Sequence, residues 1–154
     1  MPTRREYPDR PLVGVGVVVW RDKDQVLLIR RGQPPGERQW GLPGGAQALG
    51  ETLFDAAERE VREETGLEVR PIEVVTALDG ISRDEEARVR FHYTLVVVAA
   101  ESHGGEPVAA DDALDARWAS LDDVGAFVTW DETLRVVMLA AEQRRKRLAR
   151  EKQS

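Results

Sequence analysis

The sequence contains no cysteine. Without thiols there can be no disulfide framework, no thiolate metal site and no cysteine nucleophile. This absence is typical of a protein that stays in a reducing compartment, and we expect a cytoplasmic location.

Long apolar runs are also lacking. The longest covers residues 12–20 and is broken by Gly14 and Gly16, so it is far too short to span a bilayer. Residues 1–10 are polar and carry charges of both signs, unlike a secretory signal. We therefore expect no membrane association.

Positive charge is in short supply, with 22 Lys and Arg against 28 Asp and Glu and a net charge of −6. This balance argues against binding to long nucleic acid. It does not exclude a small anionic ligand, because a bound metal ion can reverse the local sign of the field.

The 154 residues, 42% of them hydrophobic and 32% charged, suit one globular domain covering residues 1–154. We expect an N-terminal extension over about residues 1–10 and a basic, solvated helix end over about residues 145–154. The run Arg144-Arg145-Lys146-Arg147 belongs to that end by its composition.

Hydrophobic periodicity and turn residues predict strands, loops and two helices along the chain. Six glycines and three prolines make residues 32–50 a loop. The predicted strands cover residues 12–20, 25–30, 69–78, 89–100 and 117–119, with a helix over 52–65 and a loop over 101–115. The order predicts an α/β (α+β) fold, an α/β/α sandwich with a mixed central β-sheet flanked by helices.

The last helix has a recognisable start. Thr129 and Glu132 fit a capping box, in which each side chain bonds the backbone of the other residue. An apolar stripe follows at helical spacing. Its members are Leu134, Val137, Met138 and Ala141.

The helix over residues 52–65 gathers negative charge on one side. Glu60, Glu63 and Glu64 are three and four residues apart, so they project from neighbouring positions, where like charges repel. Elsewhere on this helix Asp55 with Arg59, and Glu58 with Arg62, have the favourable spacing for ion pairs. The three glutamates are either a solvated acidic patch or a site for a hard divalent cation such as Mg²⁺.

The loop before this helix favours the second interpretation. Gly44 and Gly45 follow Pro43, and Gly50 precedes Glu51. Such a loop lets backbone groups approach a metal ion or a phosphate closely. A carbonyl of Gly44 or Gly45 could serve as a further ligand.

The segment from Gly45 to Leu67 resembles the Nudix box, G-x5-E-x7-R-E-U-x-E-E-x-G-U, where U is a bulky aliphatic residue. Every specified position matches, without a gap. These positions are Gly45, Glu51, Arg59, Glu60, Val61, Glu63, Glu64, Gly66 and Leu67. Many relatives carry an acidic residue three positions before Glu51, where this chain has Ala48.

The resemblance implies a role for each charged residue of the box. Glu60 and Glu64 would be the principal ligands of Mg²⁺ or Mn²⁺, with Glu63 direct or through water and Gly44 contributing its carbonyl. Arg59 would orient Glu60, and Glu51 would brace the loop against the helix. The general base is either Glu60 or a carboxylate of the later loop, which holds Asp111, Asp112 and Asp115. Asp112 is the choice by position, with a turn or cap aspartate as the alternative.

Several residues outside the helix are candidates for substrate binding. Arg30 and Arg31 end the second strand, although strand alternation should leave one of them outward. Gly45 would lie close to a phosphate. His92 or Tyr93 could line a pocket, but a hydrogen-bonded sheet-edge histidine is the simpler interpretation. Trp40 and Trp130 could stack on a base or act as buried anchors.

The resemblance implies hydrolysis of the diphosphate in a nucleoside diphosphate linked to another group, such as ADP-ribose or a nucleotide sugar. The alternatives are a pyrophosphatase that removes oxidised nucleoside triphosphates and a nucleotide-sensing module without turnover. An isomerase of isoprenoid diphosphates is disfavoured because its cysteine is missing. The expected partner is a small nucleotide. Relatives are often homodimers, and residues 3–11 could pack across such an interface.

Overall fold

A computed structural model describes residues 4–22 and 24–153. Within them the chain forms seven strands, three α-helices and one short 3-10 helix. The strands are β1 (Leu12–Arg21), β2 (Gln25–Arg31), β3 (Trp40–Gly41), β4 (Gly44–Ala46), β5 (Val69–Arg83), β6 (Val89–Ser102) and β7 (Ala113–Ser120). The helices are α1 (Leu53–Thr65), η1 (Leu121–Asp123), α2 (Val124–Phe127) and α3 (Asp131–Lys152). No helix in this part of the chain is long and apolar enough to cross a membrane.

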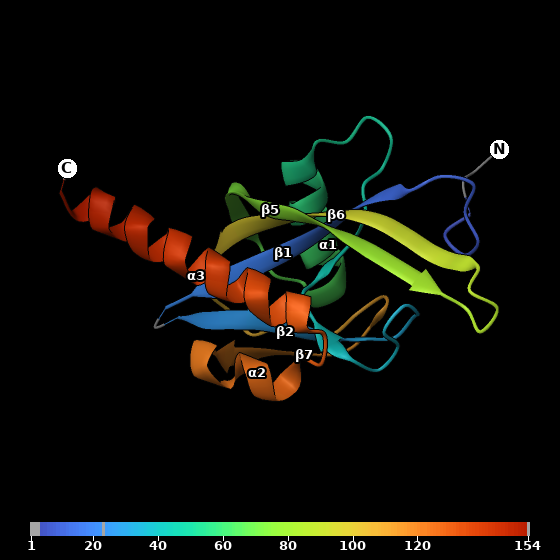
Figure 1. Cartoon of the computed structure of the whole chain (residues 1–154). Coiled ribbons are helices and arrows are strands. Elements are labelled where there is room, and N and C mark those ends of the chain that lie inside the picture. Colours follow the sequence, from blue (N-terminus) through green and yellow to red (C-terminus); the bar gives the residue numbers. More distant parts are fainter. Residues whose placement is uncertain (1–3, 23, 154) are drawn as a thin grey trace.

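The strands form one mixed sheet in the order β3-β2-β1-β6-β5, with β4 also paired to β1 and β7 to β2. β1 and β6 are parallel, and the other pairs are antiparallel. Helix α1 covers one face of the sheet and α3 the other (Figure 1). The predicted α/β/α sandwich is confirmed.

The central strand β1 is apolar on both sides, which explains why both faces need a helix. Val15, Val17 and Val19 point toward α1 and belong to the same buried cluster as Ala57 and Val61. The alternate residues of β1 face α3, where a second buried cluster forms. Its members include Val18, Trp20, Val26, Leu28, Val136, Val137 and Ala140.

The sheet forks between β1 and β2. The two strands pair only beside their turn, at Trp20 with Val26 and Arg21 with Gln25, and then diverge. The loop over residues 32–50 enters the gap, where β3 pairs with β2 and β4 with β1. The loop prediction was therefore incomplete, because two short strands hold this segment in place. Lys23, in the predicted turn, lies outside the described residues.

The N-terminus of α3 differs from the prediction. The helix begins at Asp131, with Trp130 at the N-cap position and no side-chain cap. The capping box of Thr129 and Glu132 is wrong, because Glu132 instead bonds Arg135 one turn later. The stripe also shifts, since Met138 is exposed while Val136 is buried.

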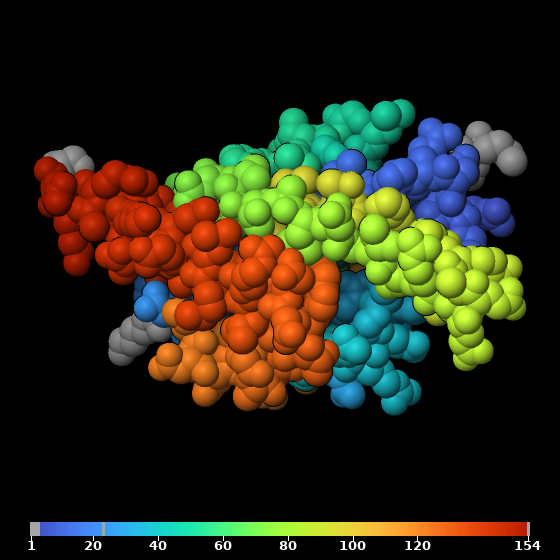
Figure 2. Space-filling view, viewed as in Figure 1, coloured from blue at the N-terminus to red at the C-terminus, as the bar shows by residue number. Residues whose placement is uncertain are grey.

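The basic run near the C-terminus is only partly solvated. Arg144 is buried and pairs with Glu101 and Asp24, and Arg147 pairs with Glu101 and Glu73. These contacts fix α3 to the sheet, and the end of the helix then extends beyond the body (Figure 2). The prediction of a solvated run is wrong for these two arginines.

Candidate active site

Helix α1 is set in place by its caps and its apolar face. The hydroxyl of Thr52 accepts a hydrogen bond from the Asp55 N–H at 3.0 Å. Gly66 ends the helix in a left-handed conformation (φ 74°), and its N–H donates to the Arg62 carbonyl. With Ala57 and Val61 packed on the sheet, the neighbouring Glu60 and Glu64 are also carried into a buried position.

Arg59 ties the loop to the helix. It donates to both carboxylate oxygens of Glu51, at 2.6 and 2.9 Å, and to the Ala46 carbonyl. It also donates to Glu60 at 2.8 Å and to Glu63 at 3.2 Å. The expected pairs of Asp55 with Arg59 and Glu58 with Arg62 are absent from the described residues, where Arg62 bonds Glu68 instead.

Glu51 accepts bonds from the helix and from the loop at once. Besides Arg59, the Ala48 N–H donates to it at 3.0 Å. The Arg59 guanidinium and then this backbone bond lower the pKa of Glu51 to about 2. Position 48 thus contributes a backbone N–H to the site. Alanine supplies this N–H as well as the acidic residue that many relatives carry there.

Glu60 and Glu64 form a buried pair of carboxyl groups. Their residues are 9% and 6% exposed. Burial, and after it the charge of Glu60, raise the pKa of Glu64 to about 8, although the Gly44 N–H at 3.4 Å and the charge of Arg31 partly oppose this rise. Two buried acids side by side are stable only with a proton or a cation between them.

Gly44 and Gly45 are required where the loop meets this pair. A Cβ on Gly45 would lie 2.5 Å from Glu60 Oε1, and one on Gly44 would collide with the Val15 carbonyl. The absence of side chains lets the loop backbone lie directly on the carboxylates.

Glu63 does not join the pair. Its side chain is 45% exposed and turns toward Arg59. In residues 4–22 and 24–153 no three Asp, Glu, His or Cys side chains are grouped closely enough to hold a metal ion. The structure therefore brings Glu60 and Glu64 together but not the predicted set of three.

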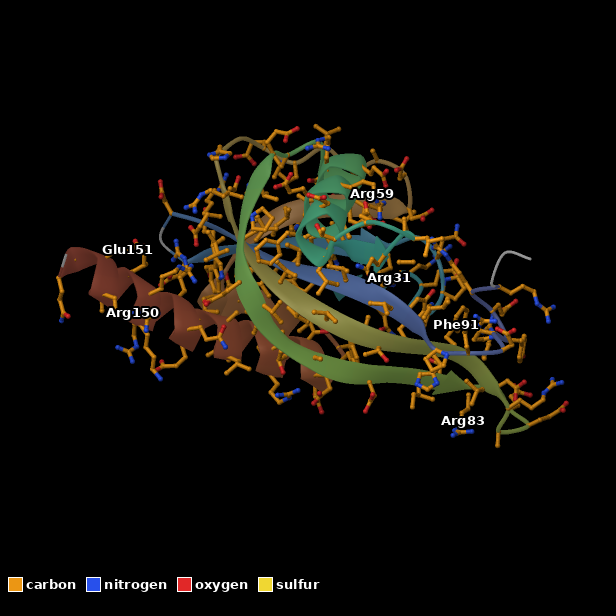
Figure 3. All side chains as sticks on the ribbon, turned by 90° about the horizontal axis from the view of Figure 1, so that it is seen from above. Arg31, Arg59, Arg83, Phe91, Arg150 and Glu151 are labelled. Atoms are coloured by element: carbon orange, nitrogen blue, oxygen red, sulfur yellow. The ribbon has the colours of Figure 1, made fainter. Side chains whose placement is uncertain are left out.

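A cavity of about 1340 Å³ opens at the fork of the sheet, beside these glutamates. The loop after β2, the β5–β6 hairpin and the start of α3 contribute its other walls. Arg31 lines it, whereas Arg30 does not and bonds the Arg38 carbonyl instead. His92 is not brought to the cavity, but Tyr93, its neighbour on β6, is. Arg31 and Arg59 are labelled in Figure 3.

The loop before β7 reaches the same cavity through backbone bonds. The Ala110 N–H donates to the Glu64 carbonyl at 2.9 Å, and Gly32 donates to the Asp112 carbonyl at 2.7 Å. Asp111 and Asp112 line the cavity, whereas Asp115, in β7 opposite Arg30, does not.

Of two further lining residues, Trp130 was a candidate for base stacking, whereas Arg5 had no signal in the sequence. Trp130 is 44% exposed at the start of α3, so the interpretation as a buried anchor is wrong. Trp40 also lines the cavity, but it packs on the core and contacts Phe127 edge to face. Arg5 also lines the cavity, although it is far from it in sequence.

Comparison with known proteins gives a consistent result. A model of the NUDIX domain matches residues 10–140. The chain is 35% identical over 114 residues to the ADP-ribose pyrophosphatase of Methanocaldococcus jannaschii, covering 74% of this chain and 64% of that protein. It is 31% identical over 108 residues to the 8-oxo-dGDP phosphatase of Danio rerio, covering 68% of this chain and 30% of that one. The matches thus span less than two thirds of either relative.

Solved structures share the fold. A MutT NUDIX hydrolase from Burkholderia pseudomallei is 28% identical with a TM-score of 0.71, covering 85% of this chain and 98% of that one. The NUDIX domain of Shewanella oneidensis NrtR, solved with ADP ribose, is 25% identical with a TM-score of 0.71, covering 88% and 89%.

Proposed function

The chain belongs to the Nudix family, and from this premise we propose that it hydrolyses the diphosphate linkage of a nucleoside diphosphate joined to another group, such as ADP-ribose or a nucleotide sugar, with Mg²⁺ or Mn²⁺. The observation that carries the proposal is the buried pair of Glu60 and Glu64 beside a large cavity. The sequence similarity to an ADP-ribose pyrophosphatase supports the choice of substrate class.

The residues present fit a hard divalent cation. Glu60 and Glu64 offer carboxylate oxygens, which Mg²⁺ and Mn²⁺ prefer, and their mutual repulsion in a buried place favours a positive ion between them. Glu63, direct or through water, and the Gly44 carbonyl would complete the ligand set. When bound, the ion would offset the negative charge of the diphosphate.

The charged side chains around the glutamate pair have distinct roles in this proposal. Arg59 holds Glu60 in place through a hydrogen bond to one carboxylate oxygen. The second oxygen of Glu60 is then available as a metal ligand. Glu51 fixes Arg59 and the loop together. Arg31 uses Nε on the Pro35 carbonyl, and its terminal nitrogens remain for a substrate phosphate.

A carboxylate must take the proton as water attacks phosphorus in line. Glu60 and Glu63 both form an ion pair with Arg59, so each has a carboxylate oxygen already occupied. Asp112 lines the cavity. Its segment is fixed to α1 by Ala110, two residues before Asp112, whose N–H donates to the Glu64 carbonyl. We assign the general base to Asp112.

A substrate screen tests the proposal when alkaline phosphatase is added to release phosphate from the products, because cleavage of the diphosphate linkage yields two phosphomonoesters and no free phosphate. Wild type should hydrolyse a nucleoside diphosphate derivative with Mg²⁺ or Mn²⁺, and Glu64→Gln should lose at least ~10²-fold in kcat, as expected when a catalytic metal loses a ligand. Asp112→Asn should lower kcat by about 10²-fold, the usual contribution of a general base, with Asp115→Asn as its control. Full activity of Glu64→Gln would refute the metal site, and full activity of Asp112→Asn would refute the role of Asp112 as general base.

The same screen addresses two other functions. The similarity to an 8-oxo-dGDP phosphatase favours adding oxidised nucleoside di- and triphosphates as substrates. The similarity to the Nudix domain of NrtR favours measuring binding of ADP-ribose apart from turnover. Tight binding with no product in any reaction would identify a sensing module instead of an enzyme.

A further inference from the structure

Residues 4–11 lie against the tip of the β5–β6 hairpin of their own chain (Figures 1 and 3). The Tyr7 N–H donates to the Arg90 carbonyl at 2.7 Å, and the Tyr7 hydroxyl donates to Asp84 at 2.8 Å. Arg90 also forms an ion pair with Glu6 at 2.6 Å. This segment, which we call the strap (residues 4–11), therefore has backbone and side-chain anchors.

The anchored conformation is not one that the segment would adopt alone. Tyr7 has a φ of 51°, in the left-handed region that residues other than glycine rarely occupy. Such a conformation persists when the surrounding contacts determine it. The guanidinium of Arg88, 5.3 Å from the centre of the Tyr7 ring, adds a further contact on the outer side.

The strap brings one cation to the cavity. Arg5 is among the lining residues, together with Ile81 and Ser82 of the same hairpin, whereas Arg4 is not. Arg5 forms no ion pair or hydrogen bond with any residue in the described part of the chain. The next two residues, Glu6 and Tyr7, are by contrast both bound to the hairpin.

The cavity that Arg5 lines contains more acidic than basic side chains. In the described residues the lining acids are Glu60, Glu63, Glu64, Asp79, Asp111, Asp112 and Glu132. The lining cations are Arg5, Arg31 and Arg59. Arg59 forms ion pairs with three glutamates, whereas Arg5 and Arg31 form no ion pair with an acid in the described residues.

We propose that Arg5 is a substrate-binding residue that contacts a phosphate oxygen of the nucleoside diphosphate compound, and that Tyr7 and Glu6 position it by fixing the strap to the hairpin. The inference rests on the proposed substrate class. Arg31 grips the substrate from β2, and Arg5 does so from the strap. A guanidinium suits this task because it offers several donors to one anionic group.

The test compares Arg5→Ala with Arg4→Ala, a neighbouring arginine outside the cavity. In steady-state kinetics with ADP-ribose, Arg5→Ala should raise KM on the order of tenfold and change kcat by less than about twofold, since a charge-assisted hydrogen bond to the substrate is lost. Arg5→Lys should restore most of the affinity, and KM of Arg5→Ala should depend less on salt than that of wild type. Arg4→Ala should behave as wild type.

The strap itself is tested with Tyr7→Phe, which loses only the hydroxyl bonded to Asp84. It should raise KM about two- to threefold, and the double variant with Arg5→Ala should be no worse than Arg5→Ala alone, because both changes act through one contact. An unchanged KM in Arg5→Ala, an equal effect of Arg4→Ala, or additive effects of Tyr7→Phe and Arg5→Ala would overturn the proposal.

Calorimetric titration with ADP separates this inference from the proposed function. If wild type turns over none of the compounds, the proposed function fails, and the ratio of ADP dissociation constants between Arg5→Ala and wild type still decides the role of Arg5. A ratio near ten supports the contact, and a ratio of one excludes it.

Discussion

At the scale of single residues, the two box acids Glu51 and Glu64 have opposite environments. Glu51 accepts bonds from a guanidinium and a backbone N–H, so its pKa is held at about 2. Glu64 is buried beside another acid, so its pKa rises to about 8. The same residue type thus acts as a fixed anionic brace in one position and as a carboxyl that needs a proton or a cation in the other.

This contrast predicts a pH dependence of stability in the protein freed of metal by a chelator. Between about pH 4.5 and pH 8 the folded chain keeps the proton on Glu64, whereas the unfolded chain releases it. Unfolding then releases a proton, so the melting temperature should fall as the pH rises through this window.

Glu64→Gln supplies the matched comparison, because glutamine cannot titrate. Its melting temperature should fall less over the same window, and Mn²⁺ should restore the stability of wild type above pH 8. Parallel melting curves for the two proteins across the window would show that Glu64 has an ordinary pKa. The pair of Glu51 and Arg59 contributes stability that is lost only at lower pH, as Glu51 becomes protonated.

At the scale of elements, α3 is attached to the sheet by both apolar packing and ion pairs. Arg144 and Arg147 share the carboxylate of Glu101, and the Arg144 guanidinium also lies 5.2 Å from the centre of the Trp20 ring. Asp24 and Glu73 complete the network. These contacts lie near the end of the helix remote from the cavity, so they affect stability rather than chemistry.

We expect Glu101→Gln to lower the free energy of unfolding by about 2 kcal/mol, since it leaves two poorly exposed guanidinium groups without their shared anion. Glu142→Gln is the control, because Glu142 pairs with Arg145 on the surface and should change stability by less than about 0.5 kcal/mol. Urea denaturation measures both values. Equal effects of the two substitutions would show that the network does not hold α3.

Elements with a strong local signal could be predicted from the sequence. Thr52, the apolar spacing and Gly66 define α1 within one residue, because each acts through contacts inside the helix. The start of α3 could not be predicted in this way. Glu132 has a local alternative in Arg135, and the position of Trp130 depends on the distant cavity.

At the scale of the whole molecule, the cavity joins the two faces of the sheet. Because β1 and β2 diverge, the glutamates of α1 and the first residues of α3 line one space. This fork was not visible in the sequence, since it depends on which strands pair beyond the turn. For the same reason alternation alone could not decide between Arg30 and Arg31, or between His92 and Tyr93.

The arrangement predicts that the two walls affect different kinetic constants. Trp130, on the α3 side, presents an exposed ring on which a nucleobase can stack, an interaction worth about 1–3 kcal/mol by truncation to alanine. Trp130→Ala should therefore raise KM by at least about fivefold with little change in kcat, whereas substitutions of the α1 glutamates lower kcat.

Trp118 offers the comparison for this variant. Its indole N–H bonds the Gly105 carbonyl and its ring contacts Arg21, and it does not line the cavity. Trp118→Phe should leave KM unchanged. If Trp130→Ala lowered kcat and left KM as in wild type, the nucleobase of the substrate would not lie against α3.

We propose that Glu60 and Glu64 hold a divalent cation beside the cavity. Mn²⁺ binding, followed through the electron paramagnetic resonance signal of the free ion, tests it without reference to any substrate. Glu64→Gln should weaken binding at least about tenfold relative to wild type, and Glu68→Gln, in a surface pair with Arg62, should not. Equal Mn²⁺ affinity in wild type and Glu64→Gln would show that this pair of carboxyl groups does not bind the ion.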